Sequence, residues 1–306
     1  MLSLLRRGNS NNNRAGFHLS SEGMAAARLI WRADAEAQLT DCVYQPLLDD
    51  HGPAAQLGNL PLGRAPVCSV LEPAGYQLLL VEAPDVPEEE LRAAVRWRIK
   101  DLINFHIDDA VIDVFEMPSH SRGAEARMMY TVAARAERVR NQVHLIGGAG
   151  FSLEAIDIEE LCLRNIADRL EEDGSGIAFL YLADRHSVLI LVRQGVMYLT
   201  RRIDTGVATL AEAEGLRGEL VAGLALEVQR SLDYFESHYD QKPVPSLYTA
   251  GLDLADRNDL AAEVSVAVKD LDLRNFLRVD CELDGDLQRR CLPAIGAALR
   301  RDEIAL

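Results

Sequence analysis

Histidine, serine and cysteine side chains carry out much of enzyme chemistry, and their spacing in this sequence favours no catalytic site. His18 has the side chain of a general base. No serine or cysteine nucleophile with a suitably spaced acid lies near it in the sequence. We therefore expect His18 to be a satisfied histidine in a turn, and we assign no catalytic residue.

Metal ligands are not expected either. His144 and His186 lack ligand spacing, and the sequence holds no HExxH motif and no cysteine–histidine cluster. The five cysteines are scattered and form no CxxC pair, which favours a reducing cytosol over a disulfide framework. The glycine-rich run at residues 147–150 follows an expected helix, so a helix C-cap explains it better than a phosphate-binding turn.

The bulk composition is typical of a cytosolic globular protein. The formal charge of −16 argues against nucleic-acid binding, because attraction to phosphates needs clustered lysines and arginines. No apolar run approaches the roughly 20 residues that span a bilayer, so direct membrane insertion is not expected. Residues 1–14 are too short for a signal peptide and turn polar at once, so we expect a flexible segment there.

A unit of three consecutive strands is predicted twice. In both units, runs of β-branched and long apolar residues are separated by Gly, Asp or Ser. The strands are expected at residues 15–19, 24–31 and 38–44, and again at 177–182, 187–192 and 196–202. After the second unit, a helix is expected at 219–239, a strand at 247–250 and a terminal helix at 286–301. This order predicts an α/β protein with two lobes.

A different block separates the two units. Strands are expected at 76–83, 111–117, 128–134 and 153–158, helices at 86–105 and 136–146, and a polar loop at 119–126. This β-α-β-β-α-β order resembles a small ferredoxin-like insert. Apolar residues of the first helix recur at helical spacing and predict its core face. Trp97 either extends that core or lines a groove for a peptide.

Five segments resemble the PilM and FtsA family of actin-like proteins, and the resemblance is collinear over nearly the whole chain. They are MLSLL at 1–5, PEEEL at 87–91, VRW at 95–97, FHIDDA at 105–110 and QRSLDYF at 229–235. The resemblance implies a two-lobed actin-like (ribonuclease-H-like) ATPase fold with a small α+β insert in the first lobe. The shorter length and altered nucleotide turns are most similar to the MshI branch, which serves assembly of the MSHA pilus.

This family resemblance divides the chain into six parts. They are a flexible N-terminal segment (1–14), the first part of the first lobe (15–75), the ferredoxin-like insert (76–158), a connecting helix of the first lobe (159–176), the second lobe (177–284) and a C-terminal helix that returns to the first lobe (285–306).

The family resemblance also implies a nucleotide held by three turns, and each turn departs from the family pattern. In the first, His18 replaces an acid that would position Mg²⁺, Ser20 replaces a glycine and Ala25 replaces a lysine. An imidazole is a poor ligand for Mg²⁺. In the second, the sequence YLA at 181–183 stands where the family has Asp-Ile-Gly, and in the third the glycine cluster is reduced to Gly251.

We therefore expect a pseudo-ATPase with no cofactor, and treat the cleft as vestigial. It is assigned to His18, Ser20, Ser21, Gly23, Tyr181, Asp184, Ser187 and Gly251. The alternative is an active actin-like ATPase whose altered turns still hold Mg·ATP. That alternative is open if Asp184 supplies the missing carboxylate from a shifted position.

A protein partner is the last implication of the resemblance. In PilM, a groove between the first lobe and the insert holds the N-terminal cytosolic peptide of PilN, a single-span inner-membrane pilus protein. The corresponding groove is assigned to Arg96, Trp97, Lys100 and Phe105. We expect a cytoplasmic adaptor, peripheral to the inner membrane through this partner, and self-association stays open. The cytosolic domain of a GspL-like type II secretion protein is a further alternative.

Overall fold

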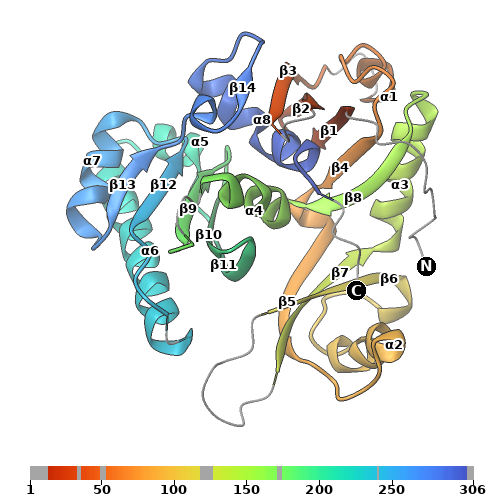
Figure 1. Cartoon of the computed structure of the whole chain (residues 1–306), viewed down its shortest axis with the longest axis horizontal. Coiled ribbons are helices and arrows are strands. Elements are labelled where there is room, and N and C mark those ends of the chain that lie inside the picture. The colour runs from red at the N-terminus through yellow and green to blue at the C-terminus, as the bar shows by residue number, and fades with distance from the viewer. Residues whose placement is uncertain are drawn as a thin grey trace.

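The computed structural model describes residues 13–32, 36–48, 53–117, 127–170, 174–239 and 241–301. Within these residues the strands form three sheets, two in separate lobes and a smaller one at one end of the molecule (Figure 1). The predicted loop 119–126 lies outside the described residues, as does the predicted flexible segment 1–14 except for its last two residues.

The first lobe is built on a six-stranded sheet with the order β14-β3-β2-β1-β4-β8. Three strands form an antiparallel meander, and β4 and β8 extend the sheet in parallel with β1. The first predicted strand unit is confirmed, with some ends extended by one or two residues. The strands are β1 (Asn13–Leu19), β2 (Gly23–Trp31), β3 (Ala37–Pro46), β4 (Val67–Leu71), β8 (Leu153–Ile158) and β14 (Arg278–Val279).

The second lobe is built on a five-stranded sheet with the order β11-β10-β9-β12-β13. Its antiparallel meander is the second predicted strand unit, which is also confirmed. The strands are β9 (Ile177–Leu182), β10 (Ser187–Arg193), β11 (Val196–Ile203), β12 (Ser246–Ala250) and β13 (Ala267–Asp270). The helices are α5 (Val207–Glu212), α6 (Arg217–Tyr239) and α7 (Leu254–Glu263).

The insert is smaller than predicted. Its sheet has the order β5-β7-β6, formed by β5 (Tyr76–Glu82), β6 (Ala110–Glu116) and β7 (Met128–Arg135), and α2 (Glu88–Ile99) packs on one face. The fourth predicted strand, β8, pairs with β4 of the first lobe instead. The second predicted helix, α3 (Ala136–Gly148), buries Ile146 in an apolar cluster of the first lobe. The ferredoxin-like arrangement is therefore wrong.

Two helices connect the lobes to each other. α4 (Glu159–Leu170) follows β8, and α8 (Gly285–Ala298) packs against β1, β2 and α4. Residues of both helices belong to the largest apolar cluster, which also includes β2, β3 and the sheet of the second lobe. The remaining elements are α1 (Pro53–Leu57) and three short 3₁₀ helices at Pro73–Gly75, Ile107–Asp109 and Leu273–Asn275.

Candidate functional site

A cleft of about 230 Å³ opens between the turn after β1 and the turn after β9. Six of the eight predicted cleft residues line it: His18, Ser20, Ser21, Gly23, Tyr181 and Asp184. The other two do not line it. Ser187 is buried, and its hydroxyl donates to the carbonyl of Thr205. Gly251 lies behind the side chain of Arg289.

The turn after β1 is closed by hydrogen bonds to the side chain of Ser20. The Oγ atom of Ser20 accepts hydrogen bonds from the backbone N–H groups of Glu22 and Gly23, each at 3.3 Å. The Ser20 N–H in turn donates to the Gly23 carbonyl at 2.9 Å. A phosphate bound at such a turn would need free backbone N–H groups. Two of those groups already have a partner within the chain.

Gly23 is needed here for packing. A Cβ atom at this position would lie 2.5 Å from the hydroxyl of Tyr44 and 2.6 Å from the carbonyl oxygen of Gln45. Its lack of a side chain therefore lets β3 approach the turn. The glycine does not by itself indicate a ligand.

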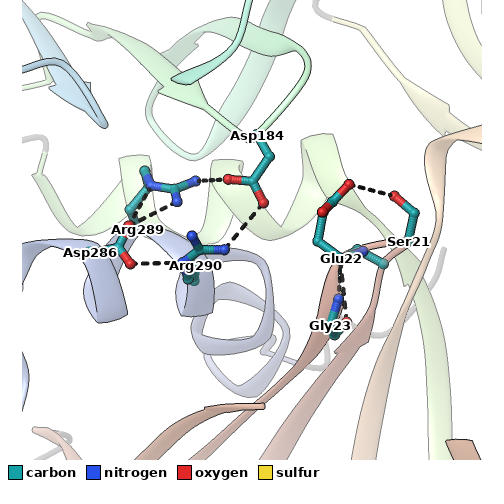
Figure 2. Close-up of polar contacts among 8 residues, drawn as sticks. Ser21, Glu22, Gly23, Asp184, Asp286, Arg289 and Arg290 are labelled. Carbon is teal, nitrogen blue, oxygen red and sulfur yellow. Dashed lines mark hydrogen bonds and ion pairs between the residues drawn. The ribbon is translucent and has the colours of Figure 1, made fainter. Parts of the chain in front are cut away.

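The second turn presents a carboxylate that two arginines hold. The N–H of Ala183 donates to the carbonyl of His186 at 2.9 Å, which leaves Asp184 at the tip. One oxygen of Asp184 lies 3.0 Å from the guanidinium of Arg289, and the other lies 3.3 Å from that of Arg290 (Figure 2). The shifted carboxylate considered above is therefore already paired.

The two arginines come from α8 and have a second acceptor on the same helix. Asp286 lies 2.9 Å from Arg289 and 2.8 Å from Arg290, at helical spacings of three and four residues (Figure 2). The Arg290 guanidinium also stacks 4.7 Å from the ring centre of Tyr44. These contacts hold two cationic side chains in the cleft wall.

Gly251 makes room for Arg289. Its φ is +105°, a conformation that favours glycine, and a Cβ atom there would lie 2.9 Å from Cδ of Arg289 and 3.0 Å from Leu182. The lack of a side chain at Gly251 therefore accommodates a side chain of this protein.

A buried carboxylate, Glu159, and two histidines, His18 and His186, also line the cleft. Glu159, the first residue of α4, accepts a hydrogen bond from Nε2 of His186 at 2.8 Å, and Arg202 lies 3.9 Å away. Burial acts to raise the pKa of Glu159, but the bond and charge of His186, with smaller contributions from His18 and Arg202, outweigh it and lower that pKa.

His18 is not the satisfied turn histidine that we expected. It lies in β1, is only 9% exposed, and its Nε2 atom has no hydrogen-bond partner in the described part of the chain. Burial lowers the pKa of His18, and the nearby Glu159 offsets this only in part. A neutral imidazole at the foot of the cleft adds no charge that would attract a phosphate.

Glu160, the next residue of α4, belongs to a separate buried contact. The hydroxyl of Tyr76, at the start of β5, donates to its carboxyl group at 2.5 Å. The pKa of Glu160 is raised to about 7, mainly by burial; the bond from Tyr76 opposes this rise, and the charge of the neighbouring Glu159 adds to it. No sequence pattern marks Glu159, Glu160 or Arg202. The spacing of Asp286 from Arg289 and Arg290, at i,i+3 and i,i+4, could have indicated an ion-pair cluster, but no such cluster was predicted.

The predicted groove residues on the insert do not act together. Trp97 is 74% exposed, so its alternative as a core residue is wrong. The Lys100 ammonium lies 5.9 Å from the centre of the Trp97 ring. Arg96 instead donates to the carbonyls of Ile107 and Ala110, at 2.6 and 3.3 Å, and so ties the following loop to α2.

A hollow of about 460 Å³ adjoins this surface and contains two of the predicted groove residues. It is lined by Lys100, Asp101, Ile103, Phe105, His106 and Ile107. The predicted helix 86–105 ends at Ile99 in the structure, and this earlier end leaves Phe105 in the loop that forms the hollow. The guanidinium of Arg135 lies over the Phe105 ring, 4.4 Å from the ring centre.

The described residues form neither a metal site nor a membrane-spanning helix. Among the described residues, no group of three or more His, Cys, Asp or Glu side chains is arranged to hold a metal ion. In the same part of the chain, no helix combines the length and apolar composition required to cross a membrane.

The fold of this chain is similar to that of solved structures. The chain is similar to PilM in a PilM–PilN type IV pilus biogenesis complex, with a TM-score of 0.76 and 19% identity over 94% of this chain and 97% of that one. The chain has a two-lobed actin-like fold. The fold class expected from the sequence is thereby confirmed.

A second solved structure has the same actin-like fold. It is the cytoplasmic domain of EpsL, an inner-membrane component of the type II secretion system of Vibrio cholerae, with a TM-score of 0.53 and 11% identity. The match covers 94% of this chain and 96% of that one. The sequence matches no protein-family model and no curated protein sequence.

Proposed function

We propose that this protein is a cytoplasmic actin-like adaptor of type IV pilus assembly that does not hydrolyse ATP. The observation that carries the proposal is the state of the cleft. Backbone donors of the first turn are bonded to Ser20, and the carboxylate of the second turn is bonded to two arginines. The residues present do not fit a Mg-nucleotide, because these backbone donors and this carboxylate have partners within the chain and His18, at the position of the metal-binding acid, is a poor ligand for Mg²⁺.

The likeness to PilM, found in a complex with PilN, supports a protein partner of the same kind. We propose that the N-terminal cytosolic peptide of a PilN-like inner-membrane protein binds the insert at the hollow beside Lys100 and Phe105. An extended segment captured in a preformed hollow needs little rearrangement. The protein would then be peripheral to the inner membrane through this partner. Within the pilus systems, we propose the MSHA type and an MshI-like role.

A second candidate function is that of a type II secretion protein. It is favoured by the likeness to the cytoplasmic domain of EpsL, which is lower than the likeness to PilM in both TM-score and identity. The partner peptide distinguishes the two functions, because each system has its own inner-membrane component.

The peptide experiment tests the proposed surface. A labelled peptide with the cytosolic N-terminal sequence of the PilN-like partner should bind the full chain at tens of micromolar or tighter by fluorescence anisotropy. Exposed aromatic side chains are frequent binding hot spots, so Trp97→Ala and Lys100→Glu should each weaken binding by about tenfold or more. Leu254→Ala, at a similarly exposed apolar position on the second lobe, is the matched control and should bind like the unaltered chain. Equal affinity for all four proteins would reject the surface.

A nucleotide experiment tests the loss of ATPase function. A ligand that binds the native state raises its thermal stability by mass action. Millimolar Mg·ATP should therefore leave the unfolding temperature unchanged when followed by differential scanning fluorimetry. A rise that grows with Mg·ATP concentration would contradict the proposal and support the active-ATPase alternative.

A further inference from the structure

We infer that Asp184, Arg289 and Arg290 form an ionic clasp across the cleft. These side chains, and not a bound ligand, set the relative position of the two lobes. This inference goes beyond the adaptor function, because it concerns the coupling of the lobes and requires no partner peptide. Figure 2 shows Asp184 on one side of the clasp and both arginines on the other.

The three residues come from different parts of the fold. Asp184 lies in the turn between β9 and β10, which belong to the sheet of the second lobe. Arg289 and Arg290 lie on α8, which packs mainly on β1 and β2 of the first lobe and on α4. Each oxygen of the single carboxylate meets a different arginine. The clasp therefore links a turn of the second lobe to a helix seated on the first.

Both lobes also enclose the arginines sterically. The Arg289 side chain is 5% exposed, and its Cδ atom packs against Gly251 of the second lobe. A Cβ atom at Gly251 would lie only 2.9 Å from that Cδ atom, too close to be accommodated. The Arg290 guanidinium stacks on Tyr44 of β3 in the first lobe. Arg289 is thus held against the second lobe and Arg290 against the first. Asp286, on the same helix α8, forms ion pairs with both guanidinium groups and keeps them in place.

Partial burial strengthens this link, because the side chains of Arg289, Asp184 and Arg290 are 5%, 22% and 28% exposed. An ion pair partly removed from water is screened less by salt than an exposed one, and loss of one partner leaves the other charge without compensation. Removal of Asp184 would leave two arginines that share only Asp286. Their mutual repulsion and need for water would favour a wider cleft.

Distance measurements between the lobes test the clasp in the full chain. Spin labels attached by non-cysteine chemistry at exposed Arg64 in the first lobe and exposed Asn258 in the second report the separation of the lobes. We expect a narrow distance distribution that neither millimolar Mg·ATP nor the partner peptide changes. Asp184→Asn should broaden it and shift its mean to longer distance, and amide exchange of residues 183–186 should rise by about tenfold or more.

Arg185→Ala is the matched control for this experiment. Arg185 is the next residue of the same turn, and its partner Glu212 lies in the second lobe, 2.5 Å away and outside the clasp. The control should keep the narrow distribution. Should Asp184→Asn fail to fold, Arg290→Gln replaces it, since this arginine is partly exposed and the clasp then loses one of its two links.

Two outcomes would overturn the inference. One is a distribution in the folded clasp variant that is indistinguishable from that of the unaltered chain. The other is a change of the unaltered chain's distribution on addition of Mg·ATP or peptide. Because peptide affinity is read separately by anisotropy, failure of the clasp and failure of the adaptor function remain distinguishable.

Discussion

Replacement of Gly16 by alanine is expected to prevent stable folding. Gly16 lies in the middle of β1, where α8 crosses the strand. A Cβ atom at Gly16 would lie 1.7 Å from the carbonyl oxygen of Ala294 and 2.9 Å from the backbone nitrogen of Ala298. These obstacles are backbone atoms of a helix and cannot rotate away, so the strand and α8 would have to separate.

The expected cost exceeds about 4 kcal/mol, the range in which single substitutions are exceptional. That is a large part of the roughly 5–15 kcal/mol that stabilises a typical domain. Gly296 should behave alike, because a Cβ atom there would lie 2.1 Å from the carbonyl oxygen of Cys162 on α4. Soluble yield, followed by urea unfolding of any soluble protein, measures both effects.

Gly223→Ala is the control for this prediction. Gly223 lies in an exposed part of α6, and a Cβ atom there would meet nothing within 4 Å. Alanine stabilises a helix interior relative to glycine by about 0.5–1 kcal/mol, so the control should become slightly more stable. A Gly16→Ala protein that unfolds within about 1 kcal/mol of the unaltered chain would show that α8 and β1 are less tightly apposed.

The individual strands and helices of this protein were largely predictable, because their signals are local. The strand units of both lobes follow runs of apolar and β-branched residues between turn residues, and α6 follows an apolar stripe at helical spacing. The five residues of β4 were missed. They are buried throughout and give no alternation that would mark a strand.

The pairing of strands was not predictable to the same degree. The pattern of β8 is the same whether it pairs within the insert or with β4, and the partner is chosen by contacts far away in the sequence. The orientation of Trp97 on α2 was likewise not predictable from the local sequence pattern. It lies between the stripe residues Val95 and Ile99, yet it points to solvent while those two are buried.

The turns that line the cleft were predictable from the sequence, but the arginine side chains that occupy it were not. The positions of His18, Tyr181 and Asp184 follow from motifs that are local in the sequence. Arg289 is more than a hundred residues from Asp184, and its spacing from Asp286 is also found in ordinary solvent-exposed ion pairs. The burial of that arginine depends on tertiary contacts, among them the packing of its side chain against Gly251.

Substitution of Glu160 by glutamine is expected to remove a pH-dependent loss of stability. Burial is the main reason that the pKa of this carboxyl rises from its ordinary value of 4.5 to about 7 in the folded protein. Between these values the folded state keeps a proton that the unfolded state has released. Stability therefore falls as pH rises from about 4.5 through about 7, and the loss persists at higher pH.

The size of this effect follows from the shift in pKa. A rise from 4.5 to about 7 corresponds to roughly 3 kcal/mol at alkaline pH, at about 1.4 kcal/mol for each pKa unit. Glutamine cannot ionise, and its carbonyl oxygen can still accept the hydrogen bond from Tyr76. The difference in unfolding free energy between Glu160→Gln and the unaltered chain should thus grow from about 1 kcal/mol at pH 5 to about 3 kcal/mol at pH 8.

Urea unfolding at several pH values between 5 and 8 measures this difference directly. The same change at Glu263, an exposed residue at the end of α7, is the control and should give a difference that stays constant with pH. A constant difference for Glu160→Gln would mean that the carboxyl is ionised in the folded protein throughout this range. Its contact with Tyr76 would then be a charged link between α4 and the start of the insert, and Tyr76→Phe should cost the same at pH 5 and pH 8, because the acceptor carries the same charge at both.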